Sequence, residues 1–270
     1  MLHVTNSSEY DWATPYDGIM MKLDEQKMKK YKIDFEKSEG IVPDLNILFQ
    51  SAGIDDPHKQ SLMIKYANEI FNENKKFNLT GHKTLLNIIE NLFINSLLSV
   101  KNLDVPRGTL FADIGTGAGI PGIPLAIKYP ESKAILFDSN NKKINFINRT
   151  SKLLDINNVT AIAGRVEELC REGGYRESFD MVFTRAMSDI YAVTELGAPL
   201  LKVTGLLFLF SGDNNEFGDY MTEHINNLGL SMENLSSIEP DSGMIIFRKI
   251  KETAVKYPRR ISVIKRMGKR

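Results

Sequence analysis

The sequence predicts an α/β protein with a doubly wound, mostly parallel sheet, and two observations support this prediction. Beyond residue 110, apolar segments of strand length alternate with amphipathic helical segments, and such alternation is typical of βαβ units. The first unit contains residues 111–122, F-A-D-I-G-T-G-A-G-I-P-G, which read as strand, glycine turn and helix. Because the turn carries few side chains, a ligand can lie against its backbone at the N-terminus of the helix.

Composition limits the class of protein. The 270 residues include 34 Lys and Arg and 34 Asp and Glu, so no overall charge points to a particular partner. The single cysteine, Cys170, excludes a disulfide framework, and the 4 scattered histidines form no metal pattern, so we expect no bound metal. The sequence has neither a long apolar run nor a signal-like N-terminus. We therefore expect a cytoplasmic protein without membrane contact. The sequence leaves the oligomeric state open, and a monomer is favoured.

Two segments precede the sheet. The first is polar and mixed in charge, a composition more typical of a disordered leader than of a functional arm. The second reads as helical, because Asp56-Pro57 and Thr84 are helix starts and apolar residues repeat every three to four positions after each. The expected parts are a polar leader at 1–40, a small helical domain at 41–107, a sheet domain at 108–250 and a basic tail at 251–270.

A carboxylate near the glycine turn indicates the ligand. Residues 134–137 read as a buried strand that ends in Asp138, roughly twenty residues beyond the glycines, where a doubly wound sheet places a carboxylate against ribose hydroxyls. The turn formally satisfies the dinucleotide fingerprint, but Asp113 at the end of the first strand would repel a pyrophosphate and suits a cation. S-adenosylmethionine, which carries an ammonium and a sulfonium, is therefore the expected cofactor. A tight turn without any ligand is the alternative.

The remaining elements of the sheet follow in order. Strands are expected at 159–163, 181–183, 206–210, 232–238 and 244–249, and helices at 142–154, 166–171, 190–201 and 219–228. Residues 239–243, E-P-D-S-G, resemble a hairpin turn, so the last two strands are expected to be antiparallel. An antiparallel end favours the methyltransferase variant of the doubly wound fold over the dinucleotide-binding plan.

The C-terminal segment is strongly basic. Residues 248–270 contain ten Lys or Arg residues and one acidic residue, Glu252. Clustered cations bind phosphates by releasing counterions, which makes RNA or DNA a candidate substrate. A solvated chain end is the alternative.

An ordered set of motifs resembles the bacterial 16S ribosomal RNA guanine-N7 methyltransferases, also called glucose-inhibited division protein B. The motifs are N-L-T at 78–80, F-A-D-I-G-T-G-A-G-I-P-G-I-P-L at 111–125, F-D-S at 137–139 with K-K at 142–143, G-R-V-E-E at 164–168, T-R-A at 184–186 and Y-P-R-R at 257–260. The resemblance implies a class I S-adenosylmethionine-dependent methyltransferase fold that ends in an antiparallel hairpin. It also implies methyl transfer to N7 of one guanosine in 16S rRNA, within the small ribosomal subunit.

The resemblance and the residue pattern together indicate the site residues. By similarity Gly115 and Ile120 line the cofactor, Val166 and Glu167 hold its adenine side, and Arg185 closes its site. The full set of expected cofactor residues is Asp113, Gly115, Gly117, Gly119, Ile120, Asp138, Val166, Glu167 and Arg185. The expected contacts to substrate RNA are Arg185, Arg259 and Arg260.

The expected chemistry needs no catalytic acid or base. Guanine N7 carries a lone pair and no proton at neutral pH, so alignment with the sulfonium methyl is sufficient. Arg185 is the polar side chain of most consequence, for which an ion pair with Asp113 or Asp138 is the alternative. The tetrapeptide that serves exocyclic amines is absent after residue 184, and Cys170 reads as an ordinary helix residue rather than a nucleophile.

Two departures from the family pattern concern substrate recognition. Family members usually read R-H-I-L-D-S where this chain reads N-L-F-I-N-S at 91–96, so Asn91, Leu92 and Asn95 replace an arginine, a histidine and an aspartate. Ser211 stands where a lysine is usual. These changes support one alternative, a non-catalytic RNA-binding paralogue. A nicotinamide-dependent oxidoreductase is the other, and Asp113 and the terminal hairpin argue against it.

Overall fold

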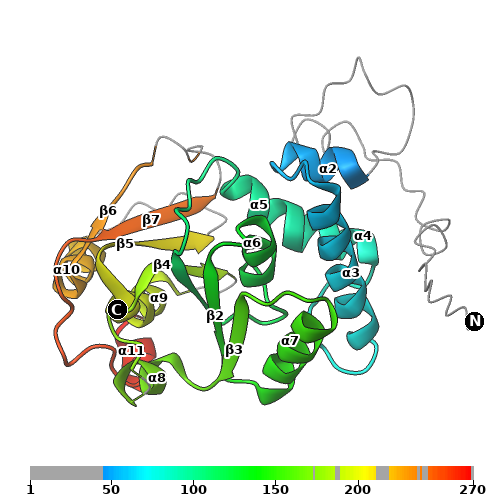
Figure 1. Ribbon diagram of the computed structural model, residues 1–270. Coiled ribbons are helices and arrows are strands. Elements are labelled where there is room, and N and C mark those ends of the chain that lie inside the picture. The colour runs from blue at the N-terminus through cyan, green and yellow to red at the C-terminus, as the bar shows by residue number, and fades with distance from the viewer. Residues whose placement is uncertain are drawn as a thin grey trace, which may run out of the picture.

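The computed structural model describes most of the chain from residue 45 onward (Figure 1). The described residues are 45–172, 174–185, 189–210, 219–235, 238 and 243–268. The expected leader at 1–40, the position of Ser211 and most of the expected hairpin turn at 239–243 lie outside them.

Among the described residues, seven strands form one sheet with the order β3-β2-β1-β4-β5-β7-β6. The strands are β1 (Leu110–Ile114), β2 (Lys133–Asp138), β3 (Val159–Ala163), β4 (Phe179–Arg185), β5 (Leu201–Phe210), β6 (Leu230–Met232) and β7 (Met244–Lys249). The first five strands pair in parallel, whereas β7 pairs antiparallel with both β5 and β6. This is the mostly parallel sheet with an antiparallel end of the class I methyltransferase type, which confirms the predicted fold class.

Several predicted element bounds differ from the structure. The strands expected at 181–183 and 206–210 are longer, since β4 begins at Phe179 and β5 begins at Leu201. The strand expected at 232–238 is β6, which begins at Leu230 and ends at Met232. The Glu233 amide still donates to the Ile246 carbonyl of β7 at 2.9 Å, whereas the Ile238 amide donates to the Leu235 carbonyl and not to β7. The helix expected at 190–201 ends earlier, since Pro199 lies in a short 3-10 turn and Leu201 already begins β5.

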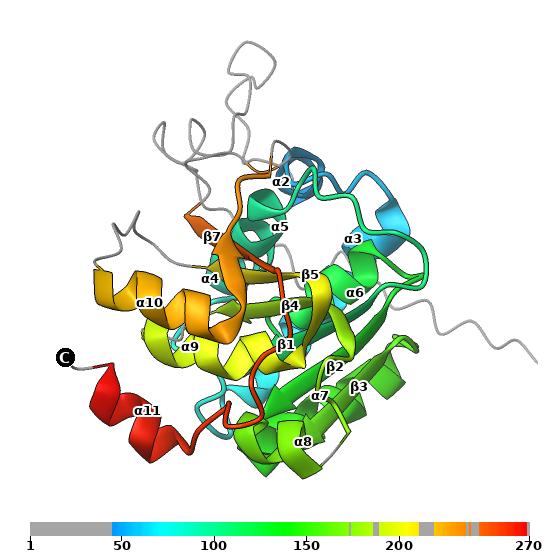
Figure 2. The ribbon, with the colours of Figure 1, turned by 90° about the vertical axis from the view of Figure 1, so that its left-hand side faces the viewer.

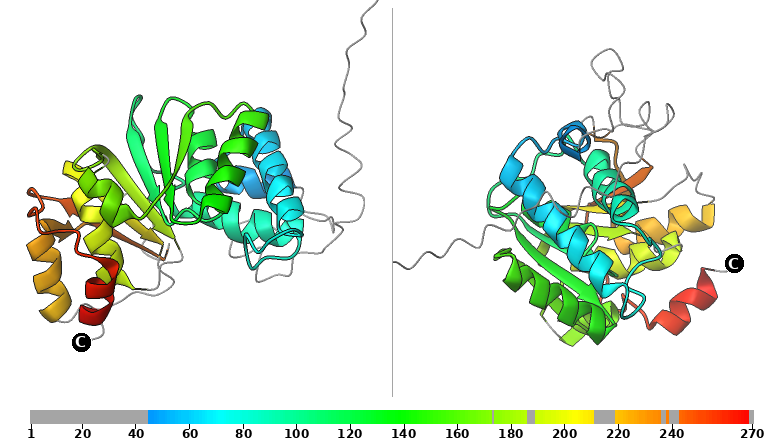
Figure 3. Two further views of the ribbon diagram at one scale, coloured as in Figure 1. Left: turned by 90° about the horizontal axis from the view of Figure 1, so that it is seen from below. Right: turned by 90° about the vertical axis from the view of Figure 1, so that its right-hand side faces the viewer.

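Helices cover both faces of the sheet, as Figure 3 shows from below. One face carries α2 (Leu45–Ser51), α3 (Pro57–Glu73), α4 (Leu85–Ile88), the π-helix η2 (Ile89–Ile94), α5 (Asn95–Ser99), α6 (Gly122–Lys128) and α7 (Asn141–Leu153). The other face carries α8 (Val166–Glu172), α9 (Ile190–Gly197), the 3-10 turn η3 (Ala198–Leu200), α10 (Asp219–Leu228) and α11 (Ile261–Met267). Figure 2 shows α10, α9 and α11 grouped on this second face, and α9 packs against both of the others.

The N-terminal helices begin where the sequence predicts. The Asp56 carboxylate accepts a hydrogen bond from the His58 amide at 2.8 Å, and Pro57 occupies the first turn of α3. The Thr84 hydroxyl accepts from the Asn87 amide at 3.2 Å and caps a helix that runs without a break through α4, η2 and α5. Within this helix, η2 has the wider π geometry, a local irregularity that is frequent at functional sites.

These helices share one hydrophobic core with the sheet. The aromatic side chains of this core that are at most 1% exposed are Phe49, Tyr66, Phe93, Phe111, Phe146, Phe183 and Phe208. Phe111 and Phe183 meet edge to face from neighbouring strands, with ring centroids 5.6 Å apart. The helical layer is therefore packed directly on β1 and β4, and the boundaries expected for a separate helical domain stay a prediction. No helix in the described part of the chain is long and apolar enough to cross a membrane.

Candidate active site

The carboxyl ends of β1, β2 and β3 meet at one edge of the sheet and bring most of the predicted cofactor residues together. Ile114 at the end of β1 pairs with Phe137 in β2, and Asp138 at the end of β2 pairs with Ala163 in β3. The glycine turn follows β1 and the first turn of α8 follows β3. Ligands of doubly wound sheets bind at this edge.

Asp113 lies fully buried at the end of β1. Its Oδ2 accepts hydrogen bonds from the Thr116 hydroxyl at 2.6 Å and from the Gly122 amide at 2.9 Å. Its Oδ1 has no hydrogen-bond partner among the described residues. Burial raises the pKa of this carboxyl to about 7, against the opposing effect of the two hydrogen bonds. A buried carboxylate oxygen of this kind is an acceptor that a cationic ligand group would satisfy.

The turn between β1 and α6 needs glycine at two positions for different reasons. Gly117 has φ +59°, and a Cβ added there would meet only the Gly115 carbonyl oxygen at 4.0 Å, so its position faces open space. Gly119 has φ +87°, and an added Cβ would lie 2.7 Å from Ile123 Cγ1 and 2.8 Å from Tyr66 Oη. The turn therefore presents bare backbone on one side and is closely packed on the other.

Asp138 ties the glycine turn to β2. Its Oδ2 accepts from the Gly117 amide at 3.0 Å and its Oδ1 from the Asn140 amide at 2.9 Å, while Lys143 Nζ lies 3.9 Å from Oδ2. Each carboxylate oxygen has two lone pairs, so both can accept a further hydrogen bond. This geometry fits the predicted role of Asp138 at the ribose.

The residues predicted for the adenine side lie one strand further along the same edge. The Gly164 amide donates to the carbonyl of Asp138 at 3.0 Å, which places the start of α8 beside the end of β2. Val166 and Glu167 form the first turn of α8, and Glu167 is 7% exposed. The turn, Asp138 and Glu167 therefore lie one after another along the same edge of the sheet.

Arg185 ends β4 and contacts the helical layer instead of a carboxylate. Its Nη1 donates to the Leu92 carbonyl at 2.9 Å and to the Ser96 hydroxyl at 2.6 Å, and its Nη2 donates to the Asn91 carbonyl. None of the ion pairs in the described part of the chain joins Arg185 to Asp113 or Asp138. Burial lowers the pKa of Arg185 and the charge of Asp113 opposes this shift, but an arginine stays charged.

The departures at 91–96 leave these acceptors in place. Asn91 and Leu92 supply backbone carbonyls, which any residue provides, and Ser96 is identical to the final serine of the usual R-H-I-L-D-S. The amides of Asn91 and Asn95 donate to carbonyls one turn earlier, at Asn87 and Asn91. The replaced side chains therefore do not hold Arg185.

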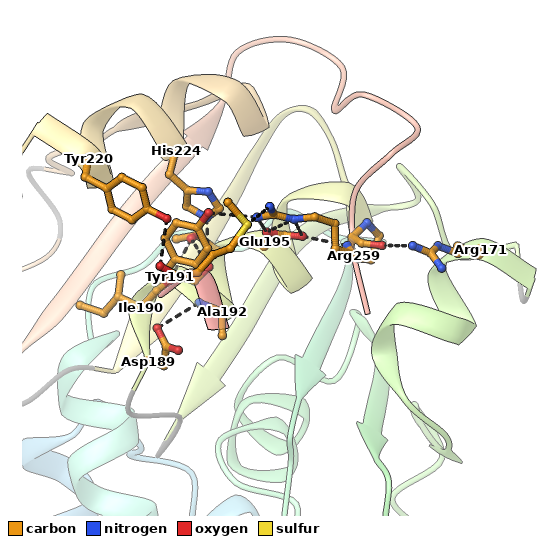
Figure 4. Close-up of polar contacts among 12 residues, drawn as sticks. Arg171, Asp189, Ile190, Tyr191, Ala192, Glu195, Tyr220, His224 and Arg259 are labelled. Atoms are coloured by element: carbon orange, nitrogen blue, oxygen red, sulfur yellow. Dashed lines mark hydrogen bonds and ion pairs between the residues drawn. The ribbon is translucent and has the colours of Figure 1, made fainter. Parts of the chain in front are cut away.

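Arg259 lies in a cluster with Tyr191 and Glu195 of α9, which Figure 4 shows. This helix covers the face of the sheet opposite the helices that Arg185 contacts. Arg259 Nε lies 2.9 Å from Glu195 Oε1, the Arg259 backbone amide donates to the same oxygen at 2.8 Å, and Arg259 Nη2 donates to the Tyr191 hydroxyl at 3.0 Å. Glu195 is fully buried, and its carboxylate raises the pKa of Arg259. The guanidinium of Arg259 is therefore engaged in an internal ion pair, whereas Arg260 is exposed at the start of α11.

Two further arginines hold the segment that precedes α11. Arg176 Nη1 donates to the Tyr257 carbonyl at 2.8 Å and Nη2 to the Thr253 carbonyl, and Arg171 donates to the Pro258 carbonyl. A groove of about 420 Å³ lies between α8 and this segment. Its lining comprises Cys170, Arg171, Gly174, Arg176, Val255 and Lys256.

Sequence reasoning missed two residues of this architecture. Glu195 had a detectable signal, because it is the single charge in the helix I-Y-A-V-T-E-L-G, and a lone buried charge needs a partner. Tyr66 had none, because it falls on an apolar face that reads as core, yet its hydroxyl donates to the Ala118 carbonyl at 3.1 Å. The described residues contain no group of three or more His, Cys, Asp or Glu that could hold a metal ion.

The sequence resembles proteins of a known family. A family model described as rRNA small subunit methyltransferase G matches residues 59–236, a span that includes all the predicted cofactor residues. A Clostridium kluyveri protein named ribosomal RNA small subunit methyltransferase G is 35% identical over 236 residues, 85% of this chain and 96% of its own length. A protein of the same name from Mycoplasmoides gallisepticum is 39% identical and covers 74% of this chain and 86% of its own. Among solved structures, the precorrin-6y C5,15-methyltransferase of Geobacter metallireducens is 18% identical over 58% of this chain and 88% of its own, with a TM-score of 0.41.

Proposed function

The chain belongs to the rRNA small subunit methyltransferase G family, and from this membership we propose that it transfers a methyl group from S-adenosylmethionine to N7 of a guanosine in 16S rRNA. The observation that supports the cofactor most directly is the buried Asp113 carboxylate, whose Oδ1 has no partner among the described residues and which lies beside an open glycine turn. We place the reaction in the cytoplasm, where ribosomes are made, and favour a monomer.

The chain has a complementary group for each part of the cofactor. We propose that Asp113 and the turn from Gly115 through Gly117 and Gly119 to Ile120 receive the amino acid part, where the carboxylate suits the ammonium. Asp138 then receives the ribose hydroxyls, and Val166 and Glu167 flank the adenine. When bound, the cofactor supplies an electrophilic methyl group on a sulfonium.

The protein's contribution to the chemistry is alignment. Guanine N7 attacks with its own lone pair, so no side chain has to remove a proton, and we assign no catalytic acid or base. Holding the two reactants in line provides on the order of 7 kcal/mol or more in well-oriented reactions. The three hydrogen bonds of Arg185 to the helical layer fix the end of β4 beside the turn. We propose that this fixed cation lies where the substrate guanosine enters.

For the rest of the RNA, the exposed cations of the C-terminal segment are the proposed phosphate contacts. Arg260 and Lys256 are exposed, and Lys256 lines the groove that also includes Arg171 and Arg176. Of the two arginines in this segment that are expected to meet RNA, Arg260 has the exposed side chain. Arg259 supports the same function indirectly, because its ion pair with Glu195 holds the segment against α9.

The non-catalytic paralogue is not favoured. Its main support was the altered segment at 91–96, and the acceptors of Arg185 in that segment are intact. The buried Asp113, Asp138 at the end of β2 and the mostly buried Glu167 also support the cofactor proposal, because they lie along one edge of the sheet.

The proposal is tested first by calorimetric titration with S-adenosylmethionine, with NAD as the control ligand. We expect binding of the first and none of the second. The protein is then incubated with 30S subunits and with free 16S rRNA from a strain that lacks this gene, and N7-methylguanosine is mapped by chain cleavage at the modified base. Cofactor binding without methylation of either RNA would contradict the proposed substrate, and binding of NAD alone would contradict the cofactor.

A further inference from the structure

We infer that the Tyr66 hydroxyl positions the glycine turn for cofactor binding, so that the helical layer forms part of the cofactor site. Tyr66 belongs to α3, 52 positions before Ala118 in the chain, and is fully buried. Its hydroxyl donates to the Ala118 carbonyl at 3.1 Å, in the middle of the turn. The inference rests on the proposed use of this turn for S-adenosylmethionine.

Tyr66 is held rigidly enough to act as a support. Its ring packs between Phe93 of the π-helix and Phe146 of α7, with centroid distances of 6.3 Å and 5.8 Å. Burial, reinforced by the charge of Asp113, raises the pKa of the phenol well above its usual value. The hydroxyl therefore stays protonated at neutral pH and can donate its hydrogen bond.

The second half of the turn depends on this contact, because the hydrogen bonds between the turn and β2 involve only the first half. The amides of Gly115 and Thr116 donate to the Phe137 carbonyl at 2.8 Å and 3.0 Å, and the Gly117 amide donates to Asp138. These bonds tie the first half of the turn to β2. In the second half, the amides of Gly119 and Ile120 donate to the Thr116 carbonyl, and the Gly119 carbonyl accepts from the Ile123 amide at 2.7 Å. These backbone bonds stay within the turn and the start of α6 and do not reach α3.

The packing around Gly119 supports the same conclusion. A Cβ at Gly119 would lie 2.8 Å from Tyr66 Oη, so the backbone of the turn approaches the hydroxyl as closely as a glycine allows. Ala118 is itself buried, which keeps water from replacing the tyrosine as donor to its carbonyl. Without the hydroxyl, the second half of the turn loses its tie to the helical layer and a buried carbonyl loses its partner.

The test compares Tyr66→Phe with a matched variant, Tyr129→Phe. Tyr129 also donates its hydroxyl to a backbone carbonyl, that of Leu103 at 2.8 Å, but it follows the C-terminus of α6, away from the turn. Both changes remove one oxygen and keep the ring. For Tyr66→Phe we expect S-adenosylmethionine binding to weaken about 3- to 10-fold by calorimetry, the range for loss of one hydrogen bond. The KM for the cofactor should rise by the same factor with kcat within about twofold, and Tyr129→Phe should leave both unchanged.

A second measurement reports on the turn itself. Hydrogen exchange at the amides of Gly119 and Ile120 should accelerate in Tyr66→Phe without ligand and stay unchanged in Tyr129→Phe. Unchanged cofactor affinity in Tyr66→Phe, or equal weakening in both variants, would overturn the inference. If the wild-type protein binds no S-adenosylmethionine, the proposed cofactor fails, and the exchange measurement still decides whether Tyr66 holds the turn.

Discussion

The ion pair between Arg259 and Glu195 should stabilise the protein, and the expected loss of unfolding free energy depends on which of the two partners is removed. Glu195 is fully buried on α9, whereas the side chain of Arg259 is 21% exposed. Arg259→Met keeps most of the apolar stem but leaves a buried carboxylate without its cation. Breaking a buried pair in this way costs about 3 to 5 kcal/mol. Arg259→Met should therefore lower the free energy of unfolding by about 3 to 5 kcal/mol.

Removing the other partner should cost less. In Glu195→Leu the guanidinium can turn toward solvent, because part of it already reaches water, and we expect a loss of about 1 to 3 kcal/mol. In the double variant both charges are replaced by apolar groups of similar volume, which is often nearly neutral. Because the two single losses add up to about 4 to 8 kcal/mol while the double variant is nearly neutral, the two substitutions should couple by about 4 kcal/mol or more.

The assay is urea unfolding followed by far-ultraviolet circular dichroism, for the wild type, the two single variants and the double variant. An exposed pair serves as control: Lys202 and Asp180 lie 2.7 Å apart with side chains 49% and 38% exposed. Lys202→Met should cost at most about 1 kcal/mol. The reasoning is refuted if Arg259→Met costs no more than Lys202→Met, or if the effects of Arg259→Met and Glu195→Leu simply add.

Three further outcomes are expected. Asp138→Ala should weaken S-adenosylmethionine binding by about 1.5 to 3 kcal/mol, the range for hydrogen bonds to a charged group; unchanged affinity by calorimetry would remove Asp138 from the site. Replacing the exposed Arg260, Lys265 and Arg266 by serine should weaken the salt dependence of rRNA binding. The slope of the log binding constant against log salt should become smaller by about 2, at roughly 0.7 per lost phosphate contact. An unaltered slope would show that the segment is a solvated chain end without phosphate contacts. His224 is 4% exposed, and burial lowers its pKa from 6.5 to about 4. The unfolded chain therefore binds more protons between these values, and stability should fall by up to about 3 kcal/mol as the pH drops from 6.5 to 4; a His224→Asn variant with the same pH dependence in urea unfolding would contradict this.

Local pattern was sufficient for the elements that build the cofactor edge. The strand before the glycine turn, the turn itself and Asp138 are encoded within some thirty consecutive residues, and parallel pairing then brings their ends together. The helix starts at Asp56 and Thr84 were equally predictable, because each cap bonds to an amide two or three positions ahead. Fold class and cofactor class could be predicted from such short-range signals.

The sequence alone determined the order of strands and helices, the glycine turn and the carboxylates beside it, because short-range periodicity and turn chemistry encode them. Only the tertiary structure decided the partners of three side chains. Arg185 meets a carbonyl 93 positions away, Arg259 a carboxylate 64 positions away, and Tyr66 the turn 52 positions away. Such pairs depend on how helices pack across the two faces of the sheet, and burial there selects partners that no spacing along the chain specifies.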